Sequence, residues 1–99
     1  MISGWITTKS FYDANRATVA KFAAVMRQTA DWANKNPNQA AEILARLSKI
    51  PLETVLKMNH NVWGTTLDPA LIQPTIDASV KYGFLPHPFT ASEMFPPRA

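Results

Sequence analysis

The strongest periodic signal in the chain runs from about Asp13 to Asn34. Apolar residues recur there at steps of three and four positions, at Val19, Phe22, Ala23, Met26, Ala30 and Ala33. This spacing places them on one face of an α-helix, while charged and amide residues lie mostly on the other faces. The pattern therefore predicts a long amphipathic helix, with Asp13 as its N-cap.

Two shorter helices are expected next. Asn36 and Pro37 supply an N-cap and a first helical residue, and the apolar face that follows consists of Ala40, Ala41, Leu44 and Leu47. This helix should end near Ser48, because Pro51 disfavours helical backbone at Ile50. A third, short helix is predicted from about Pro51 to Asn59, burying Leu52, Val55 and Leu56.

A fourth helix is predicted to begin at Asp68-Pro69 and to end before Gly83. Its apolar positions are Leu71, Ile72, Ile76 and Val80, and Pro74 removes one backbone hydrogen bond within it. The tail beyond Phe84 is rich in both apolar residues and prolines. We expect it to be extended and to lie against a surface of this chain or of a partner.

The amino-terminal segment favours a strand. Residues 4–9 read GWITTK, with aromatic and β-branched residues in succession. A lone strand cannot satisfy its own backbone groups, and no convincing second strand follows. The expected fold is thus mainly α, a single domain over residues 1–99, with about four helices, one short N-terminal strand and an extended C-terminal tail.

Composition narrows the function classes. The 99 residues contain no cysteine, which excludes disulfides and thiolate chemistry, and the formal charge is +3. No two basic residues are adjacent, which argues against a phosphate-binding stripe. We see no signal peptide and no apolar stretch near the roughly 18–20 residues of a membrane span.

Catalytic chemistry is not apparent. The two histidines, His60 and His87, have no partners at metal-ligand spacing and are interpreted as exposed loop residues. Three scattered glycines cannot build a phosphate loop, and no serine or carboxylate pair has a suitable neighbour. We therefore expect no enzyme, no cofactor and no metal. Trp5 and Trp63 are either packing residues or aromatic walls of a ligand cleft, and they are the candidate ligand-binding residues.

One alternative is a small helical interaction module or a helix-turn-helix DNA-binding module, since residues 40–55 superficially match that motif. The would-be recognition helix reads PLETVLKMN and offers no arginine. A helix that reads the major groove needs donors and positive charge, so nucleic-acid binding is disfavoured.

The order of the segments resembles the C-terminal third of ABC-transporter solute-binding proteins that serve sulfonates, nitrate, taurine and thiamine precursors. The resemblance rests on two stretches. The first is a strand and helix ending in a Trp-x-x-x-x-Pro phrase before an alanine-rich helix, WITTKSFYDANRATVAKFAAVMRQTADWANKNPNQAAEIL. The second is an Ile-Gln phrase before a helix that ends in Tyr-Gly and an extended tail, LDPALIQPTIDASVKYGFLPHPFTASEMF.

The resemblance implies a two-lobed α/β receptor that clamps a small solute, anionic or aromatic, and delivers it to an ABC permease. It places the whole parent protein in the periplasm or another extracytoplasmic compartment. The residues that would line most of the cleft are absent here, so we expect this chain alone to bind the solute weakly or not at all. A homodimer or strand-exchanged dimer would hide the surfaces that the missing sheet would cover.

Overall fold

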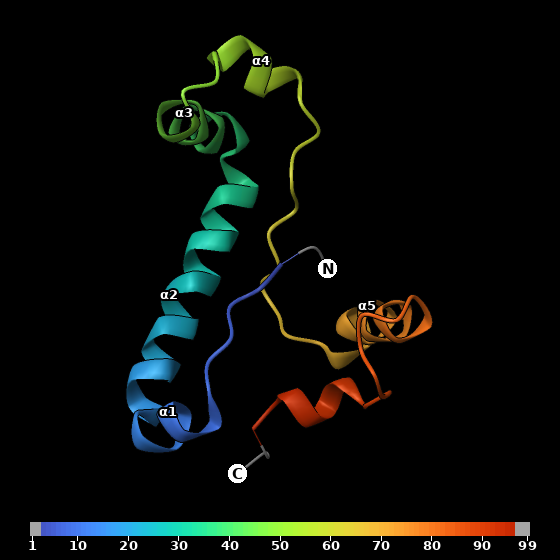
Figure 1. Ribbon diagram of the computed structural model, residues 1–99. Coiled ribbons are helices and arrows are strands. Elements are labelled where there is room, and N and C mark those ends of the chain that lie inside the picture. The colour runs from blue at the N-terminus through green and yellow to red at the C-terminus, as the bar shows by residue number, and fades with distance from the viewer. Residues whose placement is uncertain (1–2, 97–99) are drawn as a thin grey trace. The chain divides into compact units, whose positions relative to one another are not determined.

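The computed structural model describes residues 3–96 and is helical through most of them (Figure 1). The elements are α1 (Lys9–Ala14), α2 (Arg16–Lys35), α3 (Pro37–Ser48), α4 (Leu52–Lys57), α5 (Pro69–Lys81) and the short 3₁₀ helix η1 (Ala91–Met94). The mainly α fold expected from the sequence is confirmed. The chain divides into two compact units, one formed by residues 8–66 and the other by residues 1–7 with 67–99. The single domain stays a prediction.

The unit of residues 8–66 is built around the junction of α2 and α3. At Asn36 the chain leaves the axis of α2 and enters α3, while α4 follows on α3 after a tight corner (Figure 1). Lys49 forms that corner with a left-handed backbone, φ 59°, and Pro51 follows two residues later. The expected end of the helix near Ser48 is therefore confirmed, because the residue before a proline disfavours helical backbone.

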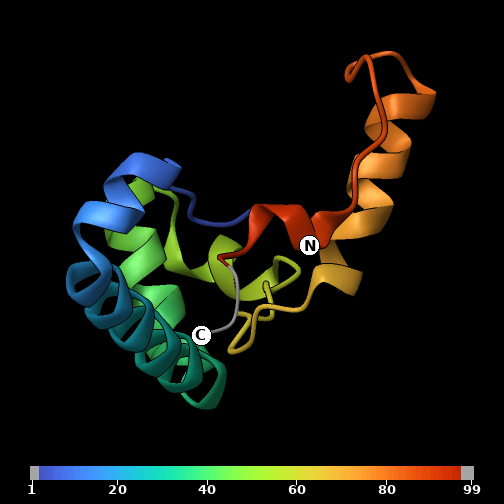
Figure 2. The ribbon, with the colours of Figure 1, turned by 90° about the horizontal axis from the view of Figure 1, so that it is seen from below.

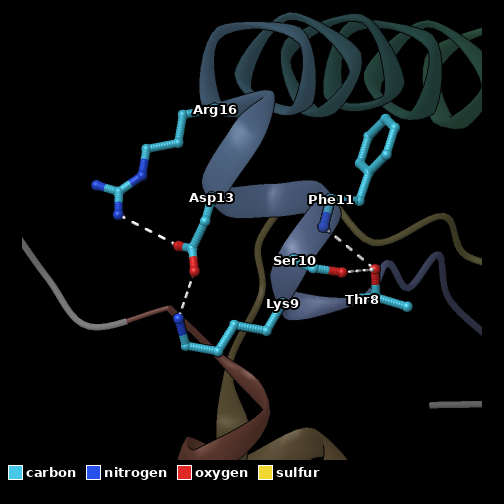
Figure 3. A network of polar contacts seen from close by, with 6 residues as sticks. All are labelled: Thr8, Lys9, Ser10, Phe11, Asp13 and Arg16. Atoms are coloured by element: carbon cyan, nitrogen blue, oxygen red, sulfur yellow. Dashed lines mark hydrogen bonds and ion pairs between the residues drawn. The ribbon is translucent and has the colours of Figure 1, made fainter.

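The start of the long helix differs from the prediction. Thr8 caps α1, with its hydroxyl accepting a hydrogen bond from the Phe11 amide (Figure 3). Asn15 is the cap residue between α1 and α2. Asp13 is thus wrong as an N-cap. It lies inside α1, where its carboxylate pairs with the cations of Lys9 and Arg16.

The unit that contains α5 consists of a helix with a returning tail. Asp68 caps α5 through a 2.9 Å hydrogen bond from the Ala70 amide, as expected from the Asp-Pro start. The helix ends at Lys81 with Tyr82 as its C-cap, and Gly83 follows with a φ of +79°, which suits glycine and turns the chain back. The tail then returns along α5 (Figure 2). The expectation that the tail lies against a surface is confirmed.

Gln73 attaches the tail to α5. Its amide nitrogen donates to the carbonyl of Phe89 at 3.1 Å, and its amide oxygen accepts from the Ala91 amide at 2.7 Å. The tail is not wholly extended, because Thr90 and Glu93 form a reciprocal capping box that starts η1. Sequence reasoning missed this short helix because the surrounding prolines dominated the pattern.

The N-terminal strand is wrong for the residues that the structure describes. Residues 3–8 form neither helix nor strand, and α1 begins at Lys9, within the segment expected to be a strand. The β-branched and aromatic residues there have no partner strand in residues 3–96. Without a ladder of backbone hydrogen bonds, strand propensity alone cannot hold the segment in a sheet.

The buried core is small in both units. In residues 3–96 the buried hydrophobic residues are Ala41 and Val55 in one unit and Ile76 and Ala91 in the other. Many large apolar side chains remain exposed, among them Leu47 at 77% and Phe84 at 82%. The helices therefore carry much more apolar surface than they bury.

Candidate functional site

The backbone of Trp63 is fixed to α2 by two hydrogen bonds with the Asn34 side chain. The side-chain nitrogen Nδ2 of Asn34 donates to the Trp63 carbonyl at 2.8 Å, and the Trp63 backbone amide donates to Oδ1 of Asn34 at 2.9 Å. One side chain near the end of α2 thus holds a loop residue 29 positions away. This contact positions the indole of Trp63 against the α2–α3 junction.

An apolar groove of about 310 Å³ lies at that junction. Its walls come from α2, α3 and the Trp63 loop, and they consist of Met26, Thr29, Ala30, Trp32, Ala33, Ala40, Ile43, Leu44, Leu47 and Trp63. The Thr29 hydroxyl donates to the Val25 carbonyl at 2.9 Å and is therefore already satisfied. The groove offers surface for apolar contact and no charged side chain.

A second hollow, of about 270 Å³, lies beside the groove and shares Ala33, Ala40, Leu44 and Trp63 with it. We call it the Trp63 pocket. Besides the shared residues, it is lined by Pro37, Ala41, Val55, Met58, Asn59, His60 and Asn61. Helices α3 and α4 supply its apolar wall, and the loop after α4 supplies its polar edge.

The polar edge of the Trp63 pocket is unpartnered. Within residues 3–96, the side chains of Asn59, His60 and Asn61 form no hydrogen bond or ion pair, and all three are exposed. Amide and imidazole groups at such an edge can donate hydrogen bonds to a ligand without first breaking an internal contact. His60 is an exposed loop histidine, as expected, but its place at a pocket was not foreseen.

The linings of the two hollows contain no Asp, Glu, Lys or Arg, within a unit of positive net charge. Residues 8–66 contain eight basic and four acidic side chains, a net charge of +4 with histidine neutral. Neither hollow has an acidic residue in its lining. An anion placed there would meet no carboxylate at contact distance.

The two candidate tryptophans fall in different units. Trp63 is half exposed, at 49%, and lines both hollows, whereas Trp5 is 75% exposed and belongs to the other unit. The hollows of residues 8–66 therefore use Trp63 and not Trp5. The role of either ring in holding a solute stays a prediction.

The clearest charged cluster surrounds Asp13 and is structural in character. The hydrogen bond from Lys9, with that cation's charge and the Arg16 guanidinium, lowers the pKa of the Asp13 carboxyl below 3.8 (Figure 3). These pairs join neighbouring turns of the chain at its exposed surface. They strengthen the local helical structure of α1 and its junction with α2.

Among residues 3–96, no three His, Asp or Glu side chains gather closely enough to hold a metal ion. Over the same range, every helix is too short or too polar to cross a lipid bilayer.

The α3–α4 corner is the part of the structure that corresponds to the predicted helix-turn-helix motif. Ala41 and Val55 are its buried residues, and α3 contacts α4. The second helix, α4, has six residues, with Glu53 in its first turn and Lys57 in its last. This helix presents one cation and one anion, a poor surface for phosphate contacts.

The Trp63 pocket was not predicted because it depends on a contact across the loop. In the sequence, nothing distinguishes Asn34 from an ordinary helix-end residue or Asn59–Asn61 from ordinary loop residues. The Asn34–Trp63 contact joins the loop that follows α4 to the end of α2, and so brings Trp63 to the hollow. Comparisons of the chain with protein-family models, with curated proteins and with solved structures found no match.

Proposed function

We propose that this chain is part of an ABC-transporter solute-binding protein, in which its helices cover a sheet supplied by the rest of a two-lobed receptor. The observation that carries the proposal is the excess of exposed apolar surface on regular helices. Isolated soluble domains rarely leave large contiguous apolar faces in water. Helices that flank a sheet need such faces.

The distribution of the exposed residues supports this role. On α3, Leu44 and Leu47 are exposed, although Ala41, one turn before Leu44 on the same apolar face, is buried. The apolar face of α3 is thus packed within its unit at Ala41 and open to solvent at Leu44 and Leu47. A sheet from the rest of the receptor would cover the open part of this face.

The parent receptor would capture a small anionic or aromatic solute and present it to a permease. Closure of two lobes around the ligand assembles such a site, so one portion of one lobe lacks most of the contacts. This chain alone is expected to show no measurable heat when titrated with taurine, nitrate or an alkylsulfonate.

The coding DNA upstream of residue 1 tests the proposal. An in-frame continuation that encodes alternating strands and helices, preceded by a signal peptide, is the expected result. The longer protein should then bind one of these solutes in a calorimetric titration. An upstream frame that encodes another architecture, or a longer protein that binds none of them, would overturn the proposal.

The second candidate is the helical interaction or DNA-binding module, and the α3–α4 corner is the observation that favours it. A mobility-shift assay with duplex DNA at low salt addresses it, since phosphate attraction is strongest there. The receptor proposal expects no shift. A shift that disappears with added salt would favour the module instead.

A further inference from the structure

The Trp63 pocket combines three features that the proposed receptor function does not use. Its wall is apolar, its edge carries amide and imidazole donors without partners, and its lining includes no acid. All of these residues belong to the unit of residues 8–66, so the pocket needs no second lobe. A hollow with an apolar interior and a few convergent polar groups is the usual form of a small-molecule site.

The size of the pocket limits the ligand. Its volume is about 270 Å³. An engineered apolar cavity of about 150 Å³ is enough to take up benzene. One aromatic ring with a short polar substituent therefore fits, whereas a fused multi-ring molecule would extend into solvent or into the adjoining groove.

The side chains that line the pocket indicate which polar substituent the aromatic ring of the ligand carries. Trp63 offers an aromatic face and Val55 and Leu44 offer aliphatic contact, which suits a ring. Asn61 and His60 can donate hydrogen bonds at the edge, and a carboxylate accepts them better than a neutral hydroxyl group does. The net charge of +4 over residues 8–66 favours the same anion.

We propose that the Trp63 pocket is a binding site for single-ring aromatic carboxylates. The ring lies against Trp63 and the α3–α4 corner, and the carboxylate accepts hydrogen bonds from the loop after α4. The chain binds this ligand without the rest of the receptor. With about ten non-hydrogen atoms in the ligand, the expected Kd is on the order of 1 mM.

Ligand-observed ¹⁹F NMR with 4-fluorobenzoate as the probe tests the site on the full chain at low protein concentration. The expected result is line broadening that saturates with a millimolar Kd, and binding at least several-fold weaker for the neutral analogue 4-fluorobenzyl alcohol. His60→Ala should weaken benzoate binding by about tenfold or more, the effect of losing one hydrogen bond to a charged group. The matched control His87→Ala, in the other unit, should leave it unchanged.

A variant that fills the pocket distinguishes binding in the pocket from non-specific binding of the probe elsewhere on the surface. Ala40 is half buried and lines the pocket, so Ala40→Met should abolish the broadening, while Ala20→Met on the exposed part of α2 should not. Far-UV circular dichroism confirms that each variant keeps its helices. Equal broadening in the His60 and His87 variants, survival of binding in Ala40→Met, or no broadening at 10-fold the expected Kd would each overturn the proposal.

Discussion

Replacing Val55 with alanine tests whether the α3–α4 corner is the stabilising core of its unit. Val55 is 1% exposed and faces the same hollow as Ala41 and Leu44. The substitution removes about two methylene equivalents at roughly 0.8 kcal/mol each. A residual cavity of about 50 Å³ would add roughly 1 kcal/mol, and the better helix propensity of alanine would return about 0.5 kcal/mol.

The net expected loss is therefore about 2 kcal/mol of unfolding free energy. For a chain of 99 residues, whose total stability is on the order of 5–15 kcal/mol, this is a large share. Urea unfolding followed by circular dichroism at 222 nm measures the loss as a lower midpoint with an unchanged slope.

Val62 provides the matched control, because Val62→Ala is the same chemical change at a residue that is 90% exposed. The expected change there is within about 0.5 kcal/mol. Equal midpoints for Val55→Ala and Val62→Ala would refute the assignment of the corner as a core.

Three further predictions concern local contacts. Gln73→Ala removes both hydrogen bonds to the tail and leaves part-buried backbone groups unsatisfied. It should lower the unfolding free energy by about 1–3 kcal/mol and speed amide exchange in the tail. Gln28→Ala, at an exposed position of α2, should change neither. Asp68→Ala should cost about 1 kcal/mol in α5 through loss of the cap, measured by thermal unfolding, and Asp68→Asn should restore most of it. The hydrogen bond from Lys9 lowers the pKa of the Asp13 carboxyl. The contribution of this pair to folding stability is therefore present above pH 3.8 and is lost as the pH falls through the lower folded-state pKa. NMR titration of the Asp13 carboxyl should therefore give a pKa below 3.8 that moves upward in 1 M NaCl, and an unchanged pKa in salt would argue against the ion pairs.

Helix positions in this chain are predictable because the signals are local. Asp68-Pro69, Asn36-Pro37, Pro51 and Gly83 each restrict the backbone of one or two residues, whatever lies nearby. The structure places helix ends at or next to all four. Helix α1 was missed because Thr8 caps it only through a side-chain contact, in a segment whose composition favours a strand.

Contacts between distant residues were harder to predict. The Asn34–Trp63 pair and the Gln73–tail contacts depend on neutral amide side chains, which carry no periodic or charge signal in a sequence. Trp63 was a candidate because of its residue type. The residues that give its pocket hydrogen-bonding capacity, Asn59 and Asn61, were not candidates, because such residues are common in any loop.

The state of association of the chain shows whether its apolar helix faces are shaped to cover something outside the chain. Static light scattering over a range of concentrations, with a fluorescent dye that reports exposed apolar surface, measures it. If these faces associate, the molar mass should rise with concentration toward at least a dimer, and dye binding should fall in parallel. A monodisperse monomer at high concentration that binds no dye would contradict this prediction.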